Sequence, residues 1–148
     1  MSSARVPYRV RRMVAERAAY LCEYCCYPED YSPDPFCIEH LRPRSKRGTN
    51  VLSNLVFACV GCNSYKSNRT EAFDPVTQTE VPLFHQRRQR WHEHFAWSPD
   101  HTLMVGLTAI GRATIIALKL NRPGVVNVRH ALIERGRHPP SDPAANEA

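Results

Sequence analysis

Two Cys-x-x-Cys pairs constrain the fold of this chain more than any other feature. The first pair is Cys22 and Cys25, the second is Cys59 and Cys62, and 33 residues separate them. Each pair places two sulfurs on one turn, and four thiolates make a closed, tetrahedral zinc site. We therefore expect a structural Zn²⁺ that fixes both ends of a long excursion of the chain.

The setting of the cysteines favours a metal over a disulfide or a redox role. No stretch approaches the roughly 18 apolar residues that cross a bilayer, and residues 1–10 lack the apolar segment of a secretory signal. We expect a cytoplasmic protein without a membrane partner, whose thiols stay reduced. A redox dithiol would need a βαβ unit around one pair, which the sequence does not predict. Cys26 and Cys37 are expected to be small buried thiols.

Charge is unevenly distributed along the chain. Lys and Arg total 20 against 14 Asp and Glu, and 17 of these cations are Arg, whose planar fork grips phosphate with two hydrogen bonds. Residues 23–39 hold five acids and no cation, whereas residues 41–69 hold six cations and no acid. This segregation indicates a basic face for nucleic acid, although a merely solvated surface also produces charge runs. The six cations are Arg42, Arg44, Lys46, Arg47, Lys66 and Arg69.

Hydrophobic spacing predicts many short elements without an internal repeat. A length of 148 residues allows one domain with an appendage. Thr108 is a fair N-cap for a helix that runs through Leu120, before Pro123. The other predicted helices cover 7–21, 60–69, 85–96 and 125–135, and the predicted strands cover 37–41, 55–58, 102–107 and the runs that flank a turn at 74–79.

A second group of side chains, inside and just after the zinc-bounded excursion, suits phosphodiester hydrolysis. Glu39 and Asn63 offer the oxygen ligands that Mg²⁺ or Mn²⁺ prefers. His40 adjoins Glu39, and an imidazole exchanges protons near neutral pH, as a general base must. Lys66 lies three residues after Asn63, on the same face of the predicted helix. These residues predict metal-assisted hydrolysis in which His40 deprotonates the attacking water.

The combined pattern resembles the HNH endonuclease domain of the zinc-knuckle, McrA-like type. The resemblance covers about residues 9–70 and implies a small ββα-metal, treble-clef-like core. With the helical and short-strand C-terminal extension, this makes an α+β protein. We expect the nuclease core at 1–72, the extension at 73–137 and a disordered tail at 138–148. The motifs are Cys22-x-x-Cys25, Glu39-His40, Asn54-Leu55 and Cys59-x-x-Cys62-Asn63-x-x-Lys66.

The resemblance also implies a role for each matched residue. His40 corresponds to the general base, and Asn54 to the middle Asn, which orients the loop carrying the His. Glu39 and Asn63 correspond to ligands of the catalytic Mg²⁺ or Mn²⁺, although many members carry Asp and His at these positions. Lys66 corresponds to a basic helix residue that contacts phosphate.

Other basic side chains are candidates for contacts with DNA. Arg42 and Arg44 follow His40 directly and are predicted to touch the DNA backbone. Residues 85–96 combine arginines with aromatic side chains, which can bind nucleic acid. An amphipathic helix that packs its aromatics on the core explains the same segment, and we favour this interpretation.

Two histidines of the 85–96 segment are predicted to play no part in metal binding. His92 and His94 are two residues apart, so they cannot share one face of a helix as ligands.

The sequence thus predicts a DNA endonuclease with structural Zn²⁺ and catalytic Mg²⁺ or Mn²⁺. A non-catalytic, zinc-dependent nucleic-acid-binding module shares the cysteines and the basic face. A protein-interaction zinc module shares the cysteines alone. The presence of both His40 and Asn54 favours the enzyme, because a binding module needs neither.

Overall fold

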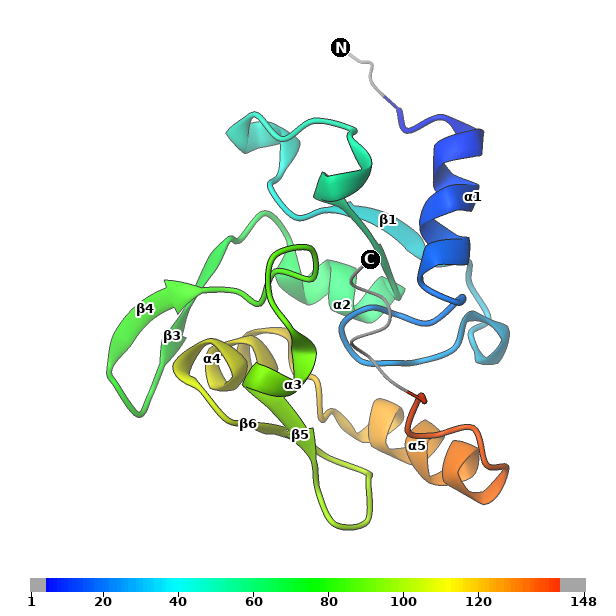
Figure 1. Cartoon of the computed structure of the whole chain (residues 1–148), viewed down its shortest axis with the longest axis vertical. Helices are drawn as coiled ribbons and strands as arrows, with labels where there is room; N and C mark the ends of the chain where they lie inside the picture. Colours follow the sequence, from blue (N-terminus) through cyan, green and yellow to red (C-terminus); the bar gives the residue numbers. More distant parts are fainter. Residues whose placement is uncertain (1–4, 142–148) are drawn as a thin grey trace.

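The computed structural model describes residues 5–141. In that range, three two-stranded antiparallel sheets alternate with helices, which confirms the predicted α+β class (Figure 1). Short 3₁₀ turns lie at Glu29–Tyr31, Arg44–Lys46 and Leu52–Asn54. The helices are α1 (Tyr8–Arg17), α2 (Val60–Lys66), α3 (Trp91–His94), α4 (Ala109–Leu118) and α5 (Pro123–Glu134). The strands are β1 (Cys37–His40), β2 (Leu55–Ala58), β3 (Glu71–Asp74), β4 (Thr79–Pro82), β5 (Phe95–Trp97) and β6 (Met104–Gly106).

The β1–β2 hairpin and α2 form the unit that carries the predicted site residues. Cys37 pairs with Ala58 and His40 with Leu55, so the loop between the strands starts directly after His40. All four residues of β2 are buried, as its unbroken apolar run predicts. One residue separates β2 from α2, and this residue, Cys59, is the N-cap of the helix. The predicted strand–strand–helix order is therefore confirmed.

Helix α1 is shorter than its predicted range of 7–21. Pro7 is the N-cap, and the helix ends at Arg17. Ala19 and Tyr20 then adopt left-handed backbone conformations, with φ of 54° and 60°, which no α-helix can continue. These two residues turn the chain into the first Cys-x-x-Cys pair.

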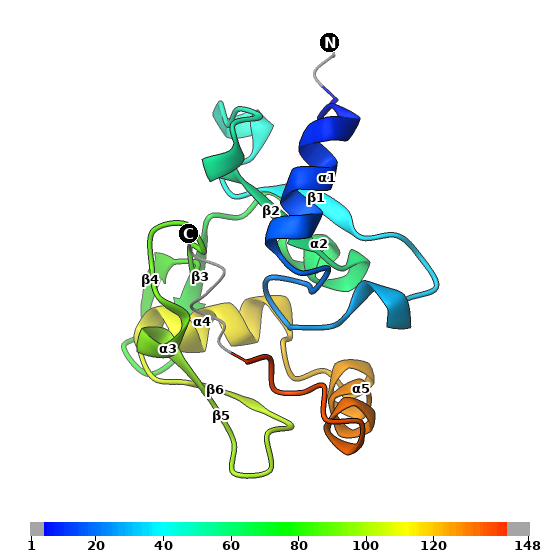
Figure 2. The same cartoon turned by 45° about the vertical axis from the view of Figure 1, so that its right-hand side comes forward.

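Helix α4 joins the C-terminal elements to the rest of the molecule. The Thr108 side chain accepts a hydrogen bond from the Gly111 backbone N–H at 3.1 Å, so the predicted N-cap is confirmed. The helix contacts β3, β4, β6 and α2, and Figure 2 shows it between the strand pairs and α5. The extension is therefore packed on the predicted nuclease core.

The predicted helix over 85–96 is wrong. Only α3 is helical in this segment, and Phe95 already belongs to β5, opposite Gly106 of β6. The side chain of Arg87 turns inward to form a buried ion pair with Glu23. Strand pairing and this ion pair override the local helical spacing. Trp91 still packs on Phe95, with ring centroids 5.5 Å apart.

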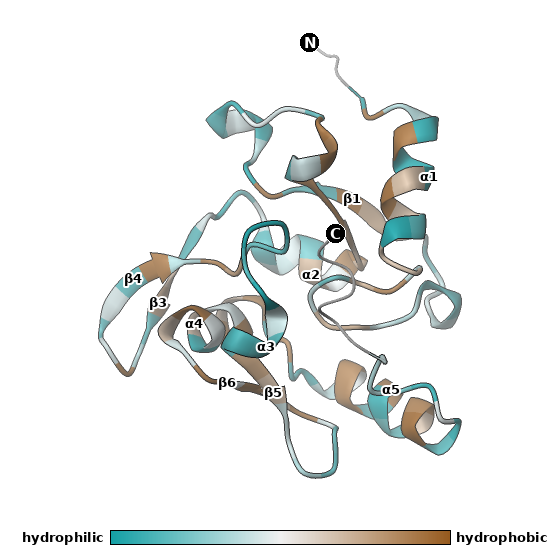
Figure 3. Ribbon diagram, viewed as in Figure 1, coloured by the Kyte–Doolittle hydropathy of each residue, from teal (hydrophilic) through white to brown (hydrophobic). Residues whose placement is uncertain are grey.

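One hydrophobic core runs through both predicted parts of the chain. Its buried members extend from Val6 to Val125, and hydrophobic stretches mark β1, β5 and β6 (Figure 3). The predicted boundary between residues 72 and 73 falls inside β3. Among the described residues, no helix is long and apolar enough to span a bilayer.

The predicted disordered tail begins too early. His138 is buried, its Nε2 lies 2.9 Å from the His101 carbonyl, and its ring packs on Trp97. This residue is therefore part of the folded structure. Residues 142–148 of the predicted tail lie outside the described residues.

Candidate functional site

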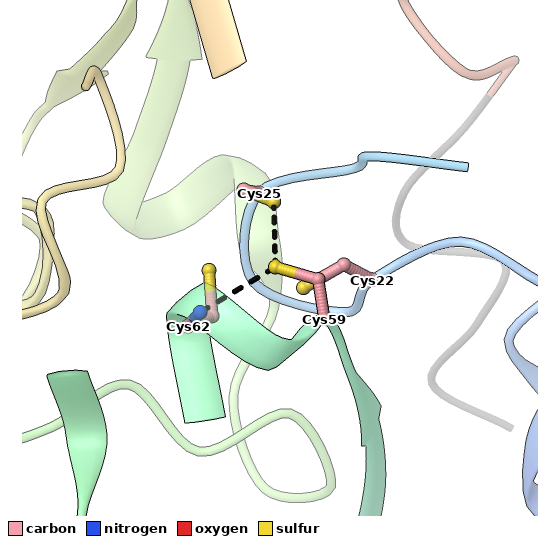
Figure 4. Close-up of side chains that lie close together, drawn as sticks. All are labelled: Cys22, Cys25, Cys59 and Cys62. Carbon is pink, nitrogen blue, oxygen red and sulfur yellow. Dashed lines mark hydrogen bonds between the residues drawn. The ribbon is translucent and has the colours of Figure 1, made fainter. Parts of the chain in front are cut away.

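The four paired cysteines meet in one cluster. The sulfurs of Cys22, Cys25, Cys59 and Cys62 all lie within 4.8 Å of one another, and all four side chains are buried. Figure 4 shows the first pair on the loop after α1 and the second pair at the start of α2. The Cys62 backbone N–H lies 3.4 Å from the Cys59 sulfur, so the helix start itself supports the ligand. The sequence prediction of a four-cysteine cluster is confirmed.

The spacing of the sulfurs fits a tetrahedral metal ion. Zn–S bonds of about 2.3 Å give a tetrahedron whose S–S edges are about 3.8 Å long. The sulfurs of Cys25 and Cys59 are 3.7 Å apart, whereas a disulfide holds its sulfurs at about 2.05 Å. Four soft sulfur donors suit zinc better than magnesium or calcium. The cluster can therefore hold a structural metal such as zinc.

The ionisation of these thiols also fits a cation site. Burial raises the pKa of Cys22 and of Cys25, because a lone thiolate is poorly solvated inside the protein. Hydrogen bonds from the other three thiols lower the pKa of Cys59. One thiolate is thus stabilised by its neighbours, and a bound cation would stabilise the remaining three.

The other two cysteines stay outside this cluster, as predicted. Cys26 and Cys37 are half-buried rather than fully buried. Burial raises the pKa of Cys26 to about 11. Burial also raises the pKa of Cys37, while a hydrogen bond from the Asn63 side chain opposes this shift.

Lys66 links the end of β1 to α2. Its ammonium group donates to Glu39 Oε2 at 2.8 Å and to the His40 carbonyl at 3.1 Å. The Lys66 residue is 1% exposed. The predicted contact of Lys66 with phosphate is therefore not the contact that the structure shows: the ammonium is engaged by a carboxylate and a carbonyl inside the protein.

Glu39 and Asn63 lie along the same β1–α2 interface. Cys37 and Glu39 are two residues apart on β1, so they share the face that meets the helix. Cys37 interacts with Asn63, and Glu39 with Lys66, which lies three residues further along α2. The two predicted ligands of a catalytic cation are thus neighbours across one interface. Their joint binding of a cation stays a prediction.

The His40 side chain leaves β1 on the opposite face from Glu39, as strand alternation requires. Its Nε2 lies 2.8 Å from Asn50 Oδ1. An amide oxygen only accepts hydrogen bonds, so Nε2 carries the proton of the neutral ring and Nδ1 keeps its lone pair. The side chains of His40, Glu39 and Asn63 therefore contact different side chains, namely those of Asn50, Lys66 and Cys37.

The sequence motifs do not include Asn50. The signal that could have found it is an amide side chain in the polar loop, four residues before the matched Asn54. Its oxygen fixes which nitrogen of His40 can accept a proton.

Asn54 holds both ends of the loop that follows His40. Its Oδ1 accepts from the Arg42 backbone N–H at 2.8 Å, and its Nδ2 donates to the carbonyls of Arg42 and Thr49 at 3.1 and 2.8 Å. The loop closes so tightly that a Cβ on Gly48 would lie 1.6 Å from the Arg42 carbonyl oxygen. The structure thus shows Asn54 bound to both ends of this loop; its role in catalysis stays a prediction.

A basic cleft opens beside this loop, between the core and the extension. Its volume is about 690 Å³, and its far wall comes from residues 82–89. Among the described residues that line it, none is acidic. Arg44 is exposed on its 3₁₀ turn but does not line the cleft. The cationic lining residues, from here on the cleft cations, are Arg42, Lys46, Arg47, Lys66, Arg69 and Arg88.

The comparison with known families agrees with this geometry. The family model described as HNH endonuclease matches residues 22–69, which contain both cysteine pairs, β1, β2 and α2. No curated protein and no solved structure matches the chain. Over residues 22–69, this chain is similar to the HNH endonuclease family.

Proposed function

We propose that this protein is a metal-dependent DNA endonuclease that hydrolyses phosphodiester bonds. The observation that carries the proposal is the match to the HNH endonuclease family over the segment that holds His40 and Asn54. The four-cysteine cluster would hold structural Zn²⁺. Glu39 and Asn63 would hold a catalytic Mg²⁺ or Mn²⁺, and DNA would be the substrate.

His40 is the residue to which we assign the proton transfer. Its Nδ1 accepts the proton of the attacking water, while Asn50 holds Nε2–H and fixes the ring. The Asn54 contacts keep the following loop closed on the end of β1. The base is thereby oriented before substrate binds, which lowers the entropic cost of reaching the reactive geometry.

Glu39 has one oxygen for the protein and one for a cation. Lys66 binds Oε2 from the inside, so the other carboxylate oxygen is the one that we assign to Mg²⁺ or Mn²⁺, together with the Asn63 amide oxygen. When bound, the cation supplies charge stabilisation at the phosphoryl and leaving oxygens. Lys66 meanwhile restricts how Glu39 can move.

Cleavage of plasmid DNA tests the proposal. The wild-type protein with Mg²⁺ or Mn²⁺ is expected to nick supercoiled plasmid, and His40→Ala is expected to be at least about 100-fold slower, because loss of a general base typically costs this much. His92→Ala removes an exposed histidine from α3 and is expected to cleave like wild type. Equal cleavage by His40→Ala would contradict the role of His40.

A second candidate function is nucleic-acid binding without catalysis. It is favoured by one observation: the side chains of His40, Glu39 and Asn63 each contact a different side chain. It predicts binding that weakens with salt but no nicking by the wild-type protein with any divalent cation. The same plasmid experiment therefore separates the two candidates.

The exposed cleft cations, which exclude the buried Lys66, are expected to bind the nucleic-acid backbone. Lys46 and Arg88 lie on opposite walls, and both are exposed. Replacing either with Ala should weaken DNA binding and lower the slope of log K against log salt by about 1, because one phosphate contact is lost. Arg90→Ala removes the same charge two residues from Arg88 but outside the cleft, so it should leave the slope unchanged. Fluorescence anisotropy at several salt concentrations measures the slopes, and equal slopes for all variants would contradict the assignment.

A further inference from the structure

Two arginines of the C-terminal extension lie against the four-cysteine cluster. Arg122, the N-cap of α5, places Nη2 at 3.4 Å from the Cys59 sulfur, and both its Nη atoms at 3.6 Å from the Cys62 sulfur. It is 60 residues away from Cys62 along the chain. Both of these cysteines lie at the start of α2, where Cys59 is the N-cap. The extension thus reaches the metal-binding sulfurs directly.

The guanidinium of Arg122 is held in place rather than free to move. Its Nη1 donates to the carbonyls of Leu118 and Lys119 at 3.2 and 3.1 Å, where α4 ends. The Tyr65 ring lies under it, with 5.5 Å between the ring centroid and Cζ. These contacts fix the planar fork so that its N–H groups face the sulfurs of α2.

Arg129 is a buried cation whose guanidinium lies over the Trp97 ring, with Cζ 5.1 Å from the ring centroid. It is 2% exposed, and its terminal nitrogens donate to the carbonyls of Cys25, Leu120 and Thr102 and to Asn121 Oδ1, at 2.7 to 3.2 Å. In the described part of the chain, all these acceptors are neutral. A buried cation is costly unless an anion lies nearby, and Cys25, whose carbonyl accepts from Arg129, becomes a thiolate when the cluster holds a metal ion.

The charge of a metal-loaded cluster resolves this difficulty. Four thiolates around one divalent cation carry a net charge of −2, and in a low-dielectric interior this charge is unfavourable without counter-ions. Arg122 and Arg129 together supply +2. Hydrogen bonds from Arg122 also draw electron density from two of the sulfurs, as donors around metal ligands generally do.

We propose that Arg122 and Arg129 form the outer part of the metal centre, neutralising a zinc–tetrathiolate dianion and making retention of the metal depend on the docked extension. The proposal rests on the cysteine cluster alone and holds whether or not the chain cleaves DNA.

Zinc release from the full-length, zinc-loaded protein tests the proposal. In excess chelator, Arg122→Gln is expected to release zinc about 10- to 100-fold faster, the range in which loss of such a supporting contact lowers metal affinity. Arg122→Lys keeps the positive charge but not the planar guanidinium, so its zinc release rate should lie between those of Arg122→Gln and wild type. Arg135→Gln removes an exposed charge from the end of α5 and should release zinc like wild type.

Gly61→Ala displaces the guanidinium without removing it. A Cβ at Gly61 would lie 2.6 Å from Arg122 Nη2 and 3.1 Å from Cζ, so the flexible end of the arginine must shift. Alanine is a better helix former than glycine, so Gly61→Ala should not weaken α2 itself. If Arg122 only supports the fold, Gly61→Ala should release zinc no faster than wild type. If Arg122 neutralises the metal centre, as we propose, Gly61→Ala should release zinc faster than wild type.

The absorption spectrum of the Co²⁺-loaded protein reports on the sulfur ligands themselves, and it would not change if Arg122 only supported the fold. Without the Arg122 hydrogen bonds the sulfurs donate more strongly, so the sulfur-to-cobalt charge-transfer band should move to longer wavelength in Arg122→Gln and in Gly61→Ala. For Arg129, Arg129→Lys should retain zinc better than Arg129→Gln, because it keeps the charge. Unchanged release rates and band positions in Arg122→Gln and Gly61→Ala, or equal zinc loss from both Arg129 variants, would overturn the proposal.

Discussion

Removal of the metal from the four-cysteine cluster is expected to unfold most of this chain. Structural zinc contributes about 10–16 kcal/mol to the folding of small zinc domains, which is similar in size to the whole stability of a typical domain, about 5–15 kcal/mol. Here the β1–β2 hairpin is a two-stranded sheet, which is marginally stable by itself. The first cysteine pair lies in a loop between α1 and β1, outside any helix or named strand. Without the cation, the two cysteine pairs at the ends of residues 22–62 are no longer held together.

The measurement is circular dichroism during heating, with zinc content determined on the same samples. The chelated protein and Cys62→Ser should lose the cooperative transition of the zinc-loaded wild type. Cys26→Ser is the matched control, because Cys26 lies outside the cluster, and it should melt within a few degrees of wild type. A chelated protein that keeps the wild-type transition would show that the cluster does not stabilise the fold.

The sequence predicted well those features that depend on local chemistry. The cysteine pairs, the strands at β1 and β2, and the Thr108 cap each follow from residues close together in the chain. The loop contacts of Asn54 have the same origin, because Arg42 and Thr49 lie within 12 residues of it. Such features need contacts only between residues close together in the chain, so a single sequence is enough to predict them.

Several features that the sequence missed depend on distant partners. The side chain of Arg87 pairs with Glu23, 64 residues away, and this buried ion pair accompanies a turn where the local spacing predicted a helix. The far wall of the basic cleft comes from residues 82–89, and the contacts of Arg122 and Arg129 with the cysteine loops come from still further along the chain. No periodicity or motif encodes such pairings.

Lys66 also has a distant partner, Glu39, which the motif does not reveal. Replacing Lys66 is therefore expected to lower the free energy of unfolding strongly. Lys66→Met keeps the length of the side chain but leaves the Glu39 carboxylate, 14% exposed, without its cationic partner. Breaking a buried ion pair in this way costs about 3–5 kcal/mol. Urea denaturation of the zinc-loaded protein measures the change. Lys46→Met removes an exposed lysine and should change stability by less than about 0.5 kcal/mol.

A double-mutant cycle separates the ion pair from other effects of the substitution. In Lys66→Met/Glu39→Gln the remaining group is neutral, so the double variant should be more stable than the sum of the two single losses predicts. If Lys66 instead contacts phosphate, Lys66→Met should leave stability unchanged and weaken DNA binding as much as Lys46→Met does. That result would return Lys66 to the role that the motif alone suggests. A coupled loss of stability would instead identify Lys66 as the link that holds Glu39 between β1 and α2.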